Sequence, residues 1–187
     1  MTFRIKKLET GDEIADVSVL AKEIWTEHYT PLIGQAQTEY MIAVFQSAER
    51  IKKDIAENNY SYFAVYANGA DDFPGRQTAY LALRPDEKGV FVSKIYVKKE
   101  CRRLGIAAMM MEFAEKFAKK SVRESGALFN SSKYKRPCLW LTVNKGNLGS
   151  IEFYKKSGFE IEREAVTDIG QGFYMDDYVM ISYFDVD

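Results

Sequence analysis

Residues 95–108, which read IYVKKECRRLGIAA, decide the fold because a strand, a turn and a helix meet within them. The β-branched and aromatic residues at their start are typical of a strand. Apolar residues then recur with the period of an amphipathic helix of about four turns. They are Ile106, Met109, Met110, Phe113 and Phe117.

Gly105 and Ala107 stand where this helix is predicted to begin. Small residues there let a ligand approach the backbone, and the free N–H groups of a first helical turn favour a phosphate. Arg102 and Arg103 add charged donors. The alternative is an ordinary turn before a helix that starts with small residues. The sequence has no GxGxxG or GxxxxGK[ST] string, so the dinucleotide and Walker-type interpretations lose their main support.

A second stretch, residues 139–159, reads LWLTVNKGNLGSIEFYKKSGF. It predicts a strand that leads through Asn147 into a short helix, which ends at Gly158. Tyr154 lies seven residues after Asn147, so both belong to one helical face. Taken singly, Asn147 could be only a helix cap and Tyr154 only a core aromatic residue.

The rest of the chain extends this pattern to the order β-α-α-β-β-β-α-β-α-β-β, which predicts a mixed sheet with flanking helices of the α/β or α+β class. We expect Pro31 and Gly34 to interrupt the first helix, and a second helical region, 35–57, to break near Gln46. Residues 124–137 are predicted to form an inserted loop. Strands are predicted at 3–8, 60–66, 77–83, 90–97, 138–143, 161–166 and 174–183.

Composition narrows the class of protein. The chain has 187 residues, of which 47% are hydrophobic and 28% charged, as expected for one folded domain rather than a disordered or membrane-spanning chain. The start of the chain does not resemble a signal peptide, and Cys101 and Cys138 have no metal-ligand spacing. We therefore expect a cytoplasmic protein with reduced thiols and no metal.

Charge is unevenly distributed along the chain. Residues 94–136 contain 12 Lys or Arg and 4 Asp or Glu, whereas residues 159–187 contain 1 and 8. The basic segment could hold an anionic ligand and the acidic segment could face a cationic one, although both could also be ordinary solvated surfaces.

Together the two stretches resemble the GCN5-related N-acetyltransferases, the GNAT superfamily. Their acetyl-CoA motif, [Gln/Arg]-x-x-Gly-x-[Gly/Ala] after a strand, is matched by Arg102, Gly105 and Ala107. Their later Asn, small residue, Tyr and Gly-Phe pattern is matched by Asn147, Ser150, Tyr154 and Gly158-Phe159. The resemblance implies a single domain over residues 1–187. Its sheet would be seven-stranded and mostly antiparallel, with flanking helices and with strands 4 and 5 splayed apart.

A narrower resemblance concerns residues 25–34 and 172–180, which look like the bacterial PaiA-type branch, whose members acetylate polyamines. It implies a small-molecule amine as acceptor, with a protein N-terminus or lysine as the alternative. A further alternative is an acyl-CoA-binding module without turnover. Nucleic-acid and membrane partners are not expected, and a homodimer is compatible with the family.

The resemblance also assigns residues to roles. Tyr154 would be catalytic, as the hydrogen-bond donor to the departing thiolate. The acceptor amine and its proton would be met by residues drawn from Trp25, Glu27, His28, Tyr29, Asp176 and Asp177. Acetyl-CoA would be held by Ile95, Tyr96, Val97, Arg102, Arg103, Leu104, Gly105, Ile106, Ala107, Ala108 and Asn147.

Overall fold

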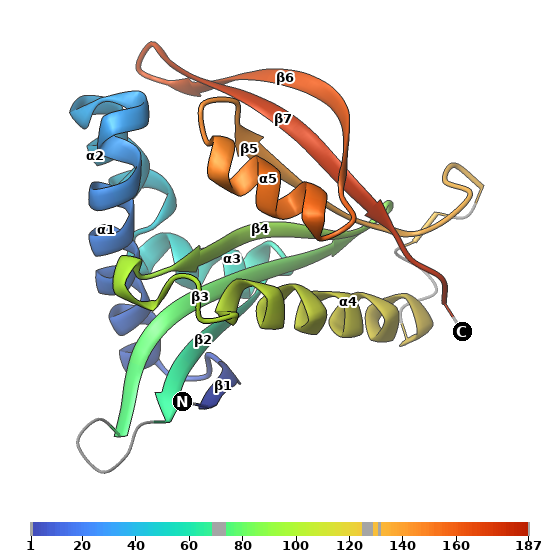
Figure 1. Cartoon of the computed structure of the whole chain (residues 1–187), viewed down its shortest axis with the longest axis horizontal. Coiled ribbons are helices and arrows are strands. Elements are labelled where there is room, and N and C mark those ends of the chain that lie inside the picture. Colours follow the sequence, from blue (N-terminus) through green and yellow to red (C-terminus); the bar gives the residue numbers. More distant parts are fainter. Residues whose placement is uncertain (1, 69–73, 125–128, 131, 187) are drawn as a thin grey trace. The chain divides into compact units, whose positions relative to one another are not determined.

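The computed structural model describes residues 2–68, 74–124, 129–130 and 132–186. Its strands form one seven-stranded sheet in the order β1-β2-β3-β4-β5-β7-β6 (Figure 1). The strands are β1 (Thr2–Lys7), β2 (Ser61–Asn68), β3 (Pro74–Asp86), β4 (Gly89–Val97), β5 (Cys138–Asn144), β6 (Glu160–Gly170) and β7 (Phe173–Tyr183). The helices are α1 (Gly11–Ile33), α2 (Gln35–Phe45), α3 (Ala48–Glu57), α4 (Ile106–Glu124) and α5 (Leu148–Lys156), with one 3₁₀ turn, η1 (Lys99–Cys101).

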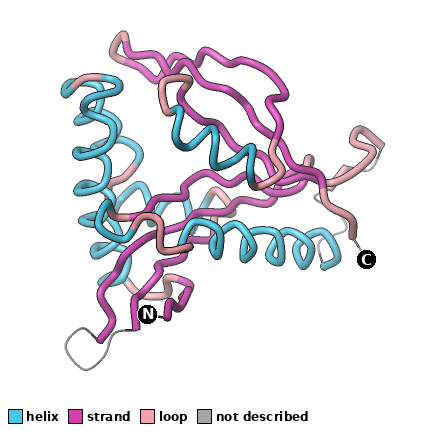
Figure 2. The backbone as a smooth tube through the Cα atoms, viewed as in Figure 1, coloured by secondary structure: helices cyan, strands magenta, loops and turns pink. Residues whose placement is uncertain are grey.

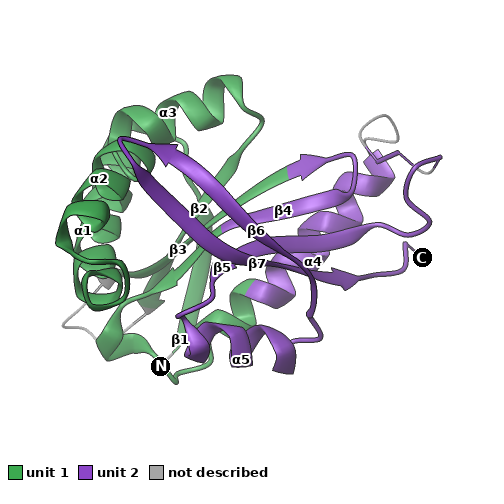
Figure 3. Ribbon diagram, turned by 90° about the horizontal axis from the view of Figure 1, so that it is seen from above, with its two compact units in different colours: residues 1–84, 94–110 green, residues 85–93, 111–187 purple. Residues whose placement is uncertain are grey.

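The chain divides into two compact units (Figure 3). Unit 1 comprises Met1–Arg84 and Lys94–Met110, and unit 2 comprises Pro85–Ser93 and Met111–Asp187. In unit 1, helix α1 begins at a capping box in which Thr10 accepts a hydrogen bond from the Glu13 amide. The apolar face of α1 packs into a core with residues of α3, β2 and β3. The buried members are Leu8, Ile14, Val17, Leu20, Ala21, Ile24, Ile51, Tyr62, Ala64, Tyr80 and Ala82.

Unit 2 is organised around strand β7, which pairs antiparallel with β5 on one side and with the long strand β6 on the other (Figure 2). Leu141, Val143, Val179 and Met180 are buried along β5 and β7. The first residues of β4 pair parallel with β5 at three positions, from Gly89↔Cys138 to Phe91↔Trp140. This short parallel register within a mostly antiparallel sheet confirms the expected fold class, including the splay of strands 4 and 5.

Most predicted elements are present, but β3 and β6 are longer than the predicted strands 77–83 and 161–166, and the end of α1 differs from expectation. Helix α1 continues through Pro31 to Ile33 and ends at Gly34, so Pro31 does not interrupt it. Proline lacks the N–H that would bond to the carbonyl four residues earlier. At Pro31 this loss disturbs little of the helix, because only Leu32 and Ile33 follow it in α1. The 35–57 region is divided as predicted: α2 ends at Phe45, and Ser47 caps α3 through the Arg50 amide. None of the described helices has the length and apolarity that a membrane span requires.

Candidate active site

In unit 1, the turn between β4 and α4 exposes its backbone. Arg103 and Gly105 both have positive φ, 63° and 81°, and α4 begins at the next residue, Ile106. A Cβ built on Gly105 meets nothing within 4 Å, so the space above it is open. The amides of a first helical turn have no acceptor within the helix, and here they adjoin that open space. This turn of unit 1 offers backbone donors.

The side chain of Arg102 holds this turn in place. Its Nε donates to the carbonyl oxygen of Val97 at 3.1 Å, and its Nη2 donates to Oε2 of Glu27 on α1, also at 3.1 Å. Lys99 lies 3.4 Å from the other oxygen of Glu27. Glu27, expected beside the acceptor amine, therefore has a carboxylate already engaged by two cations of the turn.

The aromatic residues expected around the acceptor pack on one another inside unit 1. Trp25 and Tyr29 are 3% and 7% exposed, and their ring centres are 4.1 Å apart. Tyr96, from the end of β4, lies 5.5 Å from Trp25, and the half-buried His28 meets the Tyr29 ring edge-on at 4.9 Å. This arrangement favours the core interpretation of Trp25 and Tyr29, because no cavity wall is needed to explain their burial.

In unit 2, Asn147 and Tyr154 both take the structural positions that their single-residue interpretations predicted. Asn147 is the N-cap of α5, and its Oδ1 accepts a hydrogen bond from the Ser150 amide at 3.4 Å. Tyr154 is 7% exposed, with its ring between Phe153 and Phe159 at 5.5 and 5.9 Å. The position of Asn147 is compatible with a functional role as well, because the cap bond uses only its Oδ1.

The adjacent acids Asp176 and Asp177 on β7 have different environments. Asp176 is exposed and lies 2.5 Å from Nζ of Lys145, which also donates to Glu164 at 2.8 Å. Asp177 is only 8% exposed, and its Oδ1 has no hydrogen-bond partner among the described residues. Burial, together with the charge of Asp176, raises the pKa of Asp177 to about 6, although Lys145 opposes the shift.

Asp176, Asp177 and Asn147 all lie near the end of β5 in the backbone of unit 2. Asp177 pairs with Asn144 in the β5–β7 register, and the Lys145 amide donates to the Asp176 carbonyl at 3.0 Å. Three residues after Asn144, Asn147 starts the helix that carries Tyr154. Lys145, which pairs with Asp176 and Glu164, was not singled out from the sequence, and only its position two residues after a predicted strand could have suggested it.

Two expectations on other chemistry can be compared with the structure. The described residues contain no group of three or more His, Cys, Asp or Glu side chains placed to hold a metal ion, and Cys101 and Cys138 are free thiols. The predicted loop 124–137 lies partly outside the described residues, which in it are 124, 129–130 and 132–137. Its described part belongs to unit 2.

The sequence matches the family model of the acetyltransferase (GNAT) domain over residues 58–161, more than half of the chain. The chain therefore belongs to the GNAT acetyltransferases, and it is an N-acetyltransferase of that family. No curated protein matches the sequence.

Solved structures with this fold include three N-acetyltransferases from different organisms. The PaiA N-acetyltransferase from Thermoplasma acidophilum, in complex with coenzyme A, is 19% identical, with TM-score 0.72 over 98% of this chain and 100% of that one. The ribosomal-protein-S18-alanine N-acetyltransferase from Escherichia coli is 17% identical (TM-score 0.64; 97% and 94% covered). A variant of the spermidine N-acetyltransferase SpeG from Vibrio cholerae is 15% identical (TM-score 0.58; 97% and 92% covered). At these identities the likeness concerns the fold alone.

Proposed function

We propose that this protein transfers the acetyl group of acetyl-CoA to a primary amine of a small cationic molecule, with a polyamine as the first candidate. The observation that carries the choice of acceptor is Asp177, a carboxyl group that is 8% exposed and whose Oδ1 has no hydrogen-bond partner among the described residues. A buried carboxylate oxygen without a hydrogen-bond partner is costly, and an ammonium group of a ligand would lower that cost.

The turn of unit 1 has the properties that a pyrophosphate requires. Arg103, Leu104 and Gly105 are exposed, and the space above Gly105 is free of protein atoms. The first amides of α4, from Ile106 to Ala108, would donate to phosphate oxygens, aided by the positive end of the helix dipole. Arg102 would act by fixing the turn, because its guanidinium already bonds Val97 and Glu27. Asn147 would add a donor through its amide nitrogen.

Two side chains of unit 2 would move the protons. Acetyl-CoA supplies an activated acetyl group as a thioester. Asp177, with a pKa of about 6, is mostly ionised at neutral pH and would accept a proton from the acceptor ammonium, directly or through one water. The freed amine would add to the thioester carbonyl to form the C–N bond, the C–S bond would then break, and the nitrogen would release its extra proton to solvent. The hydroxyl of Tyr154 would donate a proton to the leaving sulfur and be reprotonated from solvent.

The test is an assay of free thiol release from acetyl-CoA with a panel of spermidine, spermine, aminoglycosides, amino acids and short peptides. We expect the polyamines to give the highest kcat/KM. We also expect their apparent KM to rise with ionic strength, because attraction between a cation and an acidic site is screened by salt. Preference for neutral or anionic acceptors would refute the proposal. Preference for peptides would favour the alternative acceptor, a protein N-terminus or lysine.

Tyr154→Phe separates an enzyme from a module that only binds acyl-CoA. The variant keeps the ring that packs against Phe153 and Phe159, so the free energy of unfolding should change little. Loss of a general acid typically lowers the rate about 10²–10⁴-fold, so kcat should fall by that factor with the CoA affinity unchanged. Tyr183→Phe, at an exposed tyrosine of β7, is the matched control. A wild-type kcat in Tyr154→Phe at every pH would make Tyr154 a core aromatic residue.

We further propose that residues 1–187 act as a single acetyltransferase domain. In support, the matched residues 58–161 include parts of both units, and the PaiA structure covers 98% of this chain. The cytoplasmic location, the homodimer and membership of the PaiA-type branch stay predictions. Velocity sedimentation would test the homodimer.

A further inference from the structure

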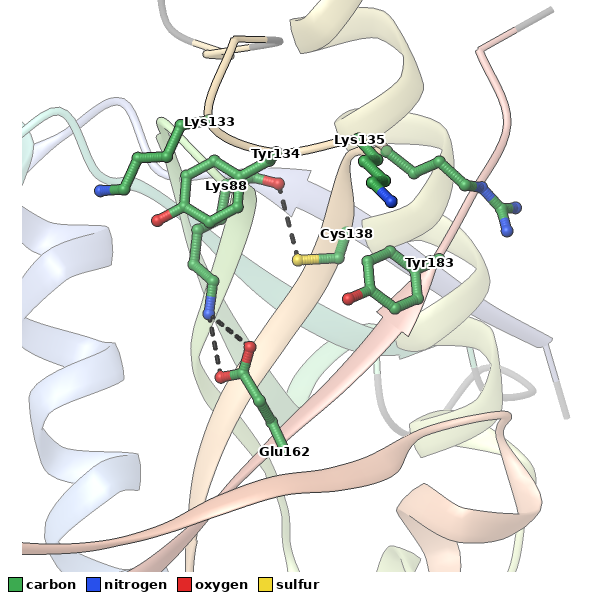
Figure 4. A pocket seen from close by; sticks show the side chains of 8 residues that line it. Lys88, Lys133, Tyr134, Lys135, Cys138, Glu162 and Tyr183 are labelled. Carbon is green, nitrogen blue, oxygen red and sulfur yellow. Dashed lines mark hydrogen bonds and ion pairs between the residues drawn. The ribbon is translucent and has the colours of Figure 1, made fainter.

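Unit 2 contains a pocket of about 360 Å³ that the proposed reaction does not use (Figure 4). Its walls come from the β3–β4 turn, the segment before β5 and the strands β5, β6 and β7. The lining residues are Lys88, Lys133, Tyr134, Lys135, Arg136, Cys138, Glu162 and Tyr183. The volume lies in the range of small-ligand sites.

The lining is strongly cationic, with four Lys or Arg side chains and one carboxylate. That carboxylate, Glu162, accepts two hydrogen bonds from Nζ of Lys88, at 3.0 and 3.1 Å. Figure 4 shows these two bonds as dashed lines. The Lys88 side chain is 20% exposed, and its Nζ lies 5.4 Å from the centre of the Trp140 ring. Lys88 and Glu162 therefore form an ion pair within the lining, and the other three lining cations are Lys133, Lys135 and Arg136.

These three cations are only partly neutralised from outside the pocket. Lys133 pairs with Glu87 at 2.5 Å and Arg136 pairs with Asp185 at 2.8 Å, and in both pairs each side chain is at least half exposed. Exposed pairs of this kind contribute little and exchange readily. Lys135 is exposed and has no ion-pair partner among the described residues. With Glu87 and Asp185 included, four cations face three carboxylates.

Hydrogen bonds hold the walls of the pocket to one another. The Cys138 amide donates to the Lys88 carbonyl at 2.9 Å, and the Asn130 amide donates to the Glu87 carbonyl at 3.0 Å. The Tyr134 amide in turn donates to the Asn130 carbonyl at 2.9 Å. Burial raises the pKa of the Cys138 thiol to about 11, so the thiol is neutral at physiological pH and adds no negative charge to the site.

We propose that this pocket binds a compact oxyanion with two or more negative charges, supplied by phosphate or carboxylate groups. At least two charges are needed because the ligand must bind Lys135 and also compete with Glu87 for Lys133 and with Asp185 for Arg136. The basic segment found in the sequence thus has two separate uses. Its early part forms the turn before α4, and its last residues, 133–136, line this second site.

Titration calorimetry at low salt, with the protein saturated with CoA, tests the proposal with inorganic pyrophosphate and citrate as probes. The test variant is Lys135→Gln/Arg136→Gln. The matched control, Lys116→Gln/Lys120→Gln, removes the same charge from exposed lysines of α4, whose partners Glu112 and Glu124 lie four residues away. Circular dichroism verifies that both variants are folded.

We expect at least one probe to bind, with affinity at least 10-fold weaker in the test variant and unchanged in the control. Stronger binding of pyrophosphate would point to a phosphate ligand, and stronger binding of citrate to a polycarboxylate. Three results would each overturn the proposal: no binding of either probe, an equal loss in both variants, or full affinity in the test variant.

Discussion

The two units bury charge in opposite ways. In unit 1, Asp54 is 1% exposed and accepts hydrogen bonds from Arg50 Nε at 2.8 Å, Tyr62 Oη at 3.0 Å and Asn58 Nδ2 at 3.1 Å. Lys94 is buried nearby, with its Nζ 5.9 Å from the centre of the Tyr62 ring. In unit 2, Asp177 is 8% exposed, and its Oδ1 has no hydrogen-bond partner among the described residues.

This difference separates structural from functional burial. A buried charge whose bonds are complete stabilises one conformation, and a ligand has nothing to add to it. A buried charge with an incomplete set of bonds costs stability, and proteins keep such groups mainly at working sites. Unit 1 therefore offers backbone amides, at the turn around Gly105, whereas unit 2 offers the side chain of Asp177. Three substitutions test this view.

The largest effect is expected for Asp177→Asn, which removes the charge and keeps the shape. We expect kcat/KM to fall about 10²–10⁴-fold, as for loss of a general base. The wild-type rate should rise with pH around the Asp177 pKa of about 6, and this limb should vanish in the variant. The test compares the pH dependence of the rate from pH 5 to 9 in the wild type, in Asp177→Asn and in the control Glu160→Gln, at an exposed position of β6. An unchanged pH profile would exclude Asp177 as the proton acceptor.

The same variant should gain stability. The pKa of Asp177 is higher in the folded protein than its ordinary value of 3.8, so the folded state binds the proton more tightly. Wild-type stability should therefore fall as pH rises from about 4 to 6 and stay lowered above that range. At pH 7–8, Asp177→Asn should raise the free energy of unfolding by about 1–3 kcal/mol, which urea denaturation measures. A loss of stability instead would mean that the carboxylate has a partner in the folded state.

The second effect in size is expected for Asp54→Ala in unit 1. It leaves the Arg50 guanidinium and the Tyr62 hydroxyl without their acceptor, which should lower the free energy of unfolding by about 2–4 kcal/mol. The kcat of the folded fraction should not change, in contrast to Asp177→Asn. Lys53→Ala, which breaks an exposed pair with Glu57 on the same helix, should cost less than about 1 kcal/mol. A fall in kcat for folded Asp54→Ala would contradict the view that the buried charge of unit 1 has only a structural role.

The smallest effect is expected for Gly105→Val. A valine is strained at φ 81°, which should cost about 1–3 kcal/mol of stability. Gly172→Val is the matched control, because Gly172 has φ 79° and equally open surroundings. Both variants should lose similar stability, but only Gly105→Val should weaken CoA binding, by about 10-fold or 1.4 kcal/mol, as measured by calorimetry. Equal CoA affinity in the two folded variants would remove the turn from the proposed site.

Local sequence patterns were enough to predict most of the secondary structure and the family of this protein. Residues that are neighbours in sequence determine the helix after Gly105, the cap at Asn147 and the end of α5 at Gly158. These local preferences agree with the folded structure, so the sequence predicts them. The family follows from the same two stretches. The continuation of α1 through Pro31 was missed because a proline within a helical pattern predicts a break. The free-energy cost of proline in a helix depends on how close it lies to the helix end.

Contacts between distant residues could be decided only by the tertiary structure. Glu27 pairs with Arg102 across 75 positions, and Lys88 pairs with Glu162 across 74. In the sequence, Asp176 and Asp177 form one acidic pair, but on adjacent positions of a strand their side chains point to opposite faces. One therefore meets solvent and Lys145, whereas the other enters the interior. The sequence by itself determined which local elements form and which family they build; packing alone decided which charges are neutralised, which are buried and which remain available to a ligand.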